Sequence, residues 1–208
     1  MPRAVREQQM LDAAVETFAQ RGYGAASMDE IAVVAGVSKP LVYLYLNSKE
    51  ELFSACIRRE AEALVAAVRG AVEPGARSAA QQLWCGLRGF FAHTAANPDG
   101  WAVLNNQART QGEPFAREIA VMREEIIELV TRLIAAASRE AGYDPELAGR
   151  EVAGLAHALV GAAESLAGWA NAPGGDSPTS KEAAATLMNF AWAGLENLMN
   201  GRHWSPAL

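Results

Sequence analysis

The residues that most often carry out catalysis or hold metals are few and scattered in this sequence. The histidines at positions 93, 157 and 203 share no spacing motif with the cysteines or with any carboxylate. No Ser-His-Asp arrangement, metal-ligand pattern or phosphate-binding glycine loop is present. Cys56 and Cys85 each lie in an apolar stretch with helical spacing, which favours reduced, buried thiols. We therefore expect no enzyme activity, no metal and no cofactor.

The stretch from Ser38 to Lys49 carries residues whose types favour contact with phosphates and with the bases of DNA. Between Ala32 and Lys49 there are two lysines and no acidic residue, so this stretch is locally positive. Pro40 and Leu41 offer apolar contact with a thymine methyl group, and lysine and backbone amides at a helix start bind phosphate. The alternative is a solvated loop and helix whose tyrosines pack on the scaffold. The predicted DNA-contacting residues are Ser27, Ser38, Lys39, Pro40, Leu41, Tyr43, Tyr45 and Lys49.

Local signals predict that these residues lie on a helix-turn-helix. Ser27 and Glu30 have the spacing of a capping box, in which the Glu30 carboxylate reaches back to the Ser27 amide. Gly36 ends this helix with positive φ. Ser38 caps the next helix, and Pro40 falls in its first turn, where a missing N–H costs nothing.

A preceding helix over residues 3–21, stopped by Gly22, is expected to brace this unit. Ser48 and Glu51 form a second capping box and open the following helix. Lys49 lies in the first turn of that helix, where a cation opposes the helix dipole, so an outside anion is the expected partner.

Over residues 5–60 the chain resembles the TetR family of bacterial transcriptional regulators. The resemblance rests on an amphipathic first helix, then RGYGAAS, MDEIAVVAGVS, KPLVYLYL and NSKEELF. The rest of the chain is similar to the family only in length and helical layout. The resemblance implies an all-α protein with a three-helix DNA-binding domain over residues 1–47. A helical effector-binding and dimerisation domain is expected over residues 48–208.

Two long helices near the C-terminus are expected to form a homodimer interface. Gly154, Gly161 and Gly168 recur every seven residues on one helix. Glycine inside a helix costs roughly 1 kcal/mol relative to alanine, so this stripe indicates close approach of another backbone. Two such helices, repeated by a two-fold axis, give a four-helix bundle, an arrangement that the resemblance also implies. The predicted interface residues are Gly154, Gly161, Gly168, Leu187, Ala191, Gly194 and Leu198.

A separate set of aromatic and polar residues is predicted to line a cavity for a small apolar effector. His157 and Glu164 are two turns apart on one face of an apolar helix, and buried polar groups need partners. A ligand is one such partner, and mutual or cross-subunit hydrogen bonding is the other. The whole set is Trp84, Phe91, His93, Trp101, Asn105, Arg109, Met122, His157, Glu164 and Trp169.

Composition agrees with a cytoplasmic protein that binds DNA selectively. The net charge is −6, and residues 1–60 carry seven Lys or Arg against eight Asp or Glu, which argues against non-specific coating of nucleic acid. The N-terminus has no apolar segment typical of a signal peptide. His157 and Glu164 interrupt the longest apolar run, so we expect no membrane span.

These observations predict a homodimeric regulator that binds a palindromic DNA operator. A repressor that a small apolar effector releases from the operator is the favoured form. The alternative is an architectural or constitutive DNA-binding protein without an effector, which would leave some 150 residues beyond the DNA-binding unit without a purpose.

Overall fold

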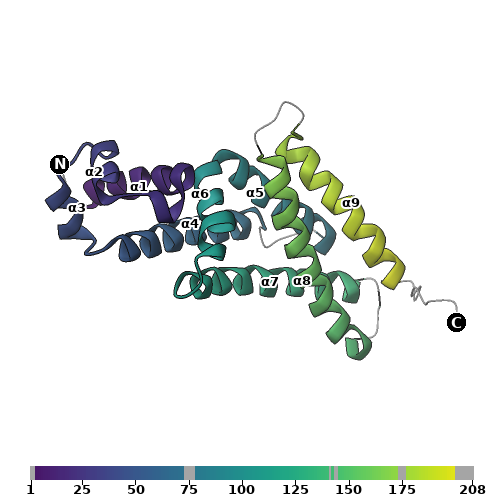
Figure 1. Ribbon diagram of the computed structural model, residues 1–208. Coiled ribbons are helices and arrows are strands. Elements are labelled where there is room, and N and C mark those ends of the chain that lie inside the picture. Colours follow the sequence, from purple (N-terminus) through teal and green to yellow (C-terminus); the bar gives the residue numbers. More distant parts are fainter. Residues whose placement is uncertain (1–2, 73–77, 141, 143–144, 173–176, 200–208) are drawn as a thin grey trace, which may run out of the picture. The chain divides into compact units, whose positions relative to one another are not determined.

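The computed structural model describes residues 3–72, 78–140, 142, 145–172 and 177–199, without the side chains of residues 145–150 and 198–199. These ranges are helical and contain no strand, so the predicted all-α class is confirmed (Figure 1). The helices are α1 (Arg3–Ala25), α2 (Met28–Val34), α3 (Lys39–Tyr45), α4 (Lys49–Ala71), α5 (Ala79–Ala96), α6 (Pro98–Ala102), the π-helical turn η1 (Val103–Gln107), the 3₁₀ turn η2 (Ala108–Thr110), α7 (Phe115–Glu140), α8 (Pro145–Ala170) and α9 (Ser180–Met199).

The helices belong to two compact units that interleave along the sequence. Unit 1 comprises Met1–Leu64 and Asn97–Met122, and unit 2 comprises Val65–Ala96 and Arg123–Leu208. Unit 1 thus combines the helix-turn-helix with α6, η1, η2 and the start of α7. The expected division of the protein at residue 47 concerns its functional domains and stays a prediction.

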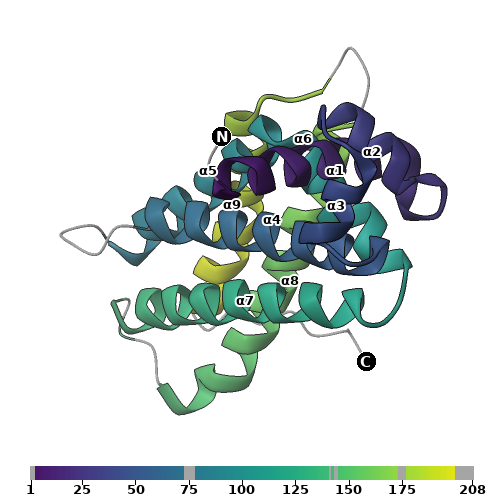
Figure 2. The same ribbon diagram turned by 90° about the vertical axis from the view of Figure 1, so that its left-hand side faces the viewer.

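An aromatic cluster organises unit 1. The ring of Tyr23 lies 4.8 Å from Phe53 and 5.3 Å from Phe115, and Phe18 lies 4.8 Å from Phe53, measured between centroids. Gly22, at φ 78°, interrupts α1 as expected and lets the chain turn back toward this cluster. The cluster therefore joins α1, α4 and α7, and α2 and α3 follow from the end of α1 (Figure 2).

Close helix packing shapes unit 2, in which α9 packs against α5 and α8. A Cβ atom added at Gly89 of α5 would lie 2.6 Å from the Cβ of Ala71 and 3.1 Å from the carbonyl oxygen of Ala67, so α5 and α4 meet where glycine leaves room. At the start of α9 the Glu182 carboxylate accepts a hydrogen bond from the Thr179 amide at 2.8 Å, and the Thr179 hydroxyl accepts one from the Glu182 amide at 3.2 Å. This capping box follows directly from the local sequence.

None of the helices in the described part of the chain has the length and apolar character needed to cross a bilayer.

Candidate nucleic-acid interface

The turn between α2 and α3 has the geometry of a helix-turn-helix. Ser27 Oγ accepts a hydrogen bond from the Glu30 amide at 3.1 Å, which confirms Ser27 as the cap of α2. The Glu30 carboxylate binds Arg21 at 3.0 Å instead of reaching back to Ser27. Gly36 takes φ 64° at the turn. Ser38 occupies the N-cap position of α3, but its side chain makes no capping bond, unlike the expectation.

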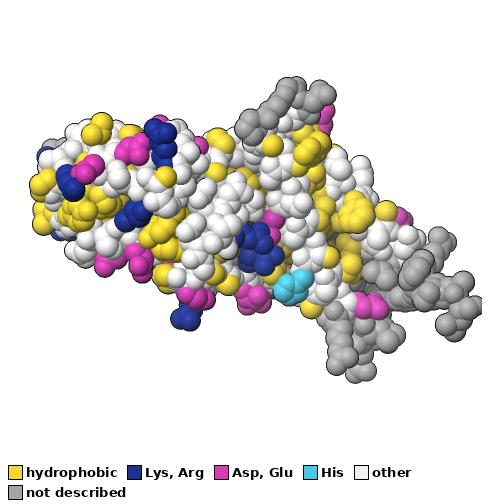
Figure 3. Space-filling model, viewed as in Figure 1, with side chains coloured by type: hydrophobic (Ala, Val, Ile, Leu, Met, Phe, Trp, Pro, Cys, Tyr) yellow, Lys and Arg dark blue, Asp and Glu magenta, His cyan; other side chains and the backbone are white. Residues whose placement is uncertain are grey.

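Helix α3 presents nearly all of its side chains to solvent. Of its seven residues, all described in the structure, only Val42 is buried. Tyr43 is 40% exposed and Leu44 is 74% exposed, and Val33 of α2 is 79% exposed. Exposed apolar groups of this size on two adjoining short helices indicate a surface that meets a partner. Figure 3 shows hydrophobic side chains beside cations at this end of unit 1.

Leu44 and Val33 are candidate contact residues that the predicted set omits. The sequence did contain a signal for Leu44. If Val42 of this seven-residue helix faces the core, Leu44, two positions further on, lies on the opposite face and is exposed. Val33 gave no such signal, since its exposure depends on how α2 packs.

Lys39 is held at the surface by an acidic neighbour. Its ammonium lies 2.9 Å from a carboxylate oxygen of Asp29 on α2, and both side chains are more than half exposed. The hydrogen bond with Asp29 raises the pKa of Lys39 above its ordinary value, so the side chain is cationic at neutral pH. Exposed ion pairs contribute little to stability, so Lys39 is able to exchange Asp29 for a phosphate.

Tyr45 and Lys49 are engaged within unit 1 in this conformation. The guanidinium carbon of Arg3 lies 5.1 Å from the centroid of the half-buried Tyr45 ring. The ammonium of Lys49 donates to the carbonyl oxygens of Tyr23, Gly24 and Ala26 at 2.9, 3.3 and 3.1 Å. The cation in the first turn of α4 is thus balanced by carbonyls of its own chain, so an outside anion is not needed to explain it.

The predicted effector residues divide between the two units. Trp101, Asn105, Arg109 and Met122 belong to unit 1, whereas Trp84, Phe91, His93, His157, Glu164 and Trp169 belong to unit 2. Phe91, Trp101 and Met122 are buried in the packing of their units, and Arg109 bonds Asn105 at 3.3 Å. Trp169 is 60% exposed. The third histidine of the sequence, His203, lies outside the described residues.

Glu164 and His157 have different environments, although both are on α8. Glu164 is buried and accepts a 2.6 Å bond from Arg123 Nε of α7. His157 is exposed. In the protomer the Glu164 carboxylate turns toward α7 and the His157 imidazole toward solvent, and the choice between a ligand and mutual or cross-subunit bonding stays a prediction.

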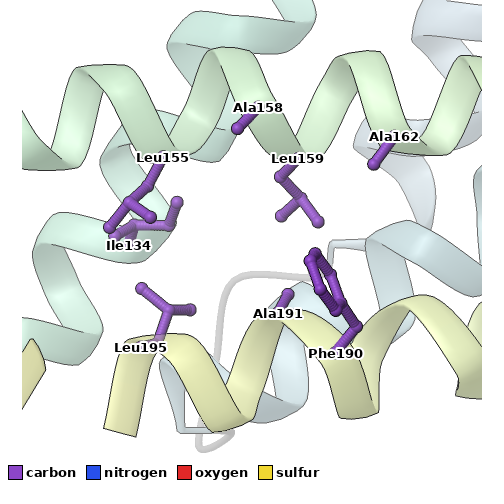
Figure 4. Close-up of a pocket in the computed structure, with 8 residues that line it drawn as sticks. All are labelled: Ile134, Leu155, Ala158, Leu159, Ala162, Phe190, Ala191 and Leu195. Atoms are coloured by element: carbon purple, nitrogen blue, oxygen red, sulfur yellow. The ribbon is translucent and has the colours of Figure 1, made fainter. Parts of the chain in front are cut away.

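An apolar hollow of about 70 Å³ lies between α8 and α9 in unit 2 (Figure 4). None of the ten predicted effector residues lines it. It is much smaller than the roughly 300 Å³ at which ligand pockets begin, so it has room for a side chain and not for a drug-sized effector. Its lining residues are Ile134, Leu155, Ala158, Leu159, Ala162, Phe190, Ala191 and Leu195.

Some of the predicted interface residues on α8 and α9 border open space, and others pack within the protomer. No described atom lies within 4 Å of a Cβ added at Gly154, Gly161 or Gly194, so these glycines border open space in the protomer. Gly168 is half-buried, and Ala191 lines the hollow. Leu187 is buried within unit 2, so it is not offered to a partner. The side chain of Leu198 lies outside the described residues.

A helix-turn-helix followed by a helical domain of this size defines a class of bacterial DNA-binding regulators, and the comparisons specify the family. A model of the tetR family of bacterial regulatory proteins matches residues 10–56, and one of the tetracyclin repressor-like C-terminal domain matches residues 79–194. The chain belongs to the TetR family of DNA-binding transcriptional regulators.

Two similar proteins illustrate this membership, and a third shares the fold alone. The transcriptional activator FasR of Mycolicibacterium smegmatis is 34% identical over 199 residues, which cover 95% of this chain and 86% of FasR. A TetR-like regulator from Rhodococcus sp. RHA1 superposes with a TM-score of 0.81 at 40% identity, over 94% of this chain and 98% of that one. AibR, solved with isovaleryl coenzyme A and operator DNA, shares the fold at a TM-score of 0.74 and 17% identity, over 89% of this chain and 97% of AibR.

Proposed function

We propose that this protein is a homodimeric repressor that binds a palindromic operator through α3 and is released by a small apolar effector. The observation that carries the proposal is the exposure of α3, which buries only Val42 among its seven described residues. A short helix with exposed lysine, tyrosine and leucine fits the major groove, where such side chains reach phosphates and base edges.

Each proposed DNA contact has a distinct chemistry. Lys39 exchanges Asp29 for a phosphate, and the Ser27 and Ser38 hydroxyls donate to phosphates. Ser27 is able to do so because its capping bond uses a lone pair and leaves the proton free. The side chains that contact bases or sugars are Pro40, Leu41, Tyr43 and Tyr45, with Leu44 and Val33 added from their exposure.

The dimer is proposed to form through α8 and α9. The open space at Gly154 and Gly161 admits a partner helix at close range. Phe190, 76% exposed beside the hollow, and Trp169, 60% exposed, are apolar groups that a second copy would cover. A two-fold axis through this face gives a four-helix bundle, and the dimer has two copies of α3, as a palindromic site requires.

The effector is proposed to be an apolar group carried on a small molecule, bound in the C-terminal domain. Of the predicted effector set, Trp84, Phe91, His93, His157 and Glu164 belong to unit 2, and these five remain the proposed lining. Support for the chemical class comes from AibR, which binds isovaleryl coenzyme A. FasR is named an activator, so an effector-dependent activator is the second candidate.

Selection from a pool of random-sequence 30-base-pair duplexes tests the DNA-binding part. We expect the parent protein to enrich a palindrome. Lys39→Ala and Tyr43→Ala should lower its affinity for the recovered duplex, while Lys181→Ala, an exposed lysine on α9, should leave it unchanged. Recovery of no common sequence would contradict the proposal.

A thermal-shift series of acyl coenzyme A molecules with increasing chain length tests the effector. A molecule that raises the melting temperature should weaken binding to the recovered duplex if the protein is a repressor of the proposed kind. Tighter binding in its presence supports the activator instead, because an effector shifts binding only in the direction of the state it prefers. No stabilisation by any member would exclude this class of effector.

A further inference from the structure

We propose that Lys49 is a positioning residue, which holds the turn between α1 and α2 against α4 and thereby sets the orientation in which α3 meets DNA. It does so through its ammonium group and makes no phosphate contact. The proposal deepens the DNA-binding function above and rests on it.

The ammonium of Lys49 has its hydrogen-bonding capacity filled by this turn. A lysine ammonium carries three protons, and three carbonyl oxygens accept from it: Tyr23 at 2.9 Å, Ala26 at 3.1 Å and Gly24 at 3.3 Å. The nitrogen also lies 4.7 Å from the centroid of the Tyr23 ring, within cation–π range. A phosphate would have to displace these partners before Lys49 could bind it.

The three carbonyls that Lys49 binds lie at the C-terminal end of α1 and directly after it, where helix carbonyls run out of partners along the chain. Gly22 breaks the helical path at φ 78° and ψ 157°, and the peptides after it end one helix before Ser27 begins the next. Carbonyls at a helix C-terminus are satisfied by water or by a cation. Lys49 supplies this cation, although it lies 23 to 26 positions further along the chain than the carbonyls it binds.

Holding this turn fixes α2, and through α2 it fixes α3. Ala26, whose carbonyl binds Lys49, directly precedes the α2 cap Ser27, and its own side chain is buried. The other side of the turn is bonded too, since the Tyr23 amide donates to Gln107 Oε1 of η1 at 3.4 Å. The turn is therefore a junction within unit 1 at which α1, α2, α4 and η1 meet.

Lys39 provides the contrast within the same unit. Its partner is one exposed carboxylate, whereas Lys49 is half-buried with three backbone partners. The two lysines should thus differ in how they affect salt dependence. Losing a phosphate contact lowers the slope of log K against log salt concentration by about 0.9 per contact. Losing a positioning group lowers affinity at every salt concentration by the same factor.

The experiment compares Lys49→Met and Lys39→Met in the full-length protein. Affinity for the duplex recovered by the parent is measured from 50 to 300 mM KCl, and hydrogen exchange is followed in the free protein over peptides covering residues 22–31. For Lys49→Met we expect about tenfold faster exchange in these peptides, weaker binding and an unchanged salt slope. For Lys39→Met we expect unchanged exchange and a lower slope.

Lys49→Gln keeps two N–H donors without the charge. Its hydrogen exchange over residues 22–31 should therefore be slower than that of Lys49→Met, and the salt slope of its DNA affinity should equal that of the parent. Lys49→Gln also replaces Lys49→Met should that variant not fold. A salt slope lowered by about 0.9 per lysine in Lys49→Met or in Lys49→Gln would overturn the proposal. Hydrogen exchange in Lys49→Met that equals that of the parent would also overturn it. If the parent recovers no duplex, the proposed function fails, but the exchange data still decide whether Lys49 holds the turn.

Discussion

Replacing Gly161 by leucine should have opposite effects on the dimer and on the fold of each protomer. No described atom lies within 4 Å of a Cβ at this position, so the protomer has room for a side chain there. Leucine in place of glycine in a helix should then raise the stability of the protomer by roughly 0.7 kcal/mol. In the proposed dimer the same side chain would meet the partner helix.

The expected magnitude at the interface is larger than this gain. Overpacking costs typically about 1–3 kcal/mol per site, and a two-fold axis applies the cost twice. The sum of about 2–6 kcal/mol raises the Kd of the dimer roughly 30-fold to 20,000-fold.

Sedimentation velocity over a concentration series measures the dissociation, and urea unfolding at concentrations where the variant is monomeric measures the fold. Gly70→Leu is the matched control, because Gly70 of α4 also has nothing described within 4 Å but lies off the stripe. The control should stay dimeric. A Gly161→Leu protein that is as dimeric as the parent would refute the placement of the interface on this stripe.

Three further predictions concern stability. Gly89→Ala should lower the free energy of unfolding by about 1–3 kcal/mol in urea titrations, because its Cβ would lie 2.6 Å from that of Ala71. The control Gly70→Ala should raise the free energy of unfolding slightly. If both variants change the free energy of unfolding by the same amount, α5 and α4 do not approach closely at Gly89. Arg123→Met should cost about 3–5 kcal/mol because it leaves the buried Glu164 carboxylate without its 2.6 Å partner. Adding Glu164→Met should recover most of that loss, and no recovery in urea titrations would show that the pair is not the cause. Burial raises the pKa of the Cys56 thiol to about 12, so between about pH 9 and pH 12 the unfolded chain ionises this thiol and the folded chain does not. The stability of the folded state should fall by up to about 1.4 kcal/mol per pH unit in that window, and Cys56→Ala should remove this part of the pH dependence in urea titrations at each pH.

Much of the helix-turn-helix follows from signals that act over a few residues. Ser27 caps α2, Gly22 and Gly36 take positive φ where helices stop, and Thr179 pairs with Glu182 at the start of α9. Each of these depends on groups no more than four positions apart, so the neighbouring residues specify it whatever the rest of the chain does. The same signals led to the TetR resemblance, which the family models confirm.

The partners of charged side chains depended on residues far away in the sequence. Lys49 was predicted to bind an outside anion, yet its ammonium meets carbonyls of the turn after Gly22. Glu164 was considered beside His157, yet its carboxylate binds Arg123, 41 positions away. Helical spacing places His157 and Glu164 on one face, but it does not say which neighbouring helix covers each end of that face.

The amino-acid sequence by itself therefore determined the main helices, the caps of α2 and α9, the helix-turn-helix and the family. The tertiary structure decided which partners Lys39 and Lys49 have, which carboxylate is paired inside the protein and which glycines border open space. The physical reason is the range of the interactions. Helix propensity and capping act within one or two turns, whereas an ammonium or a carboxylate is stabilised by whichever polar groups the folded chain brings within about 3 Å of it.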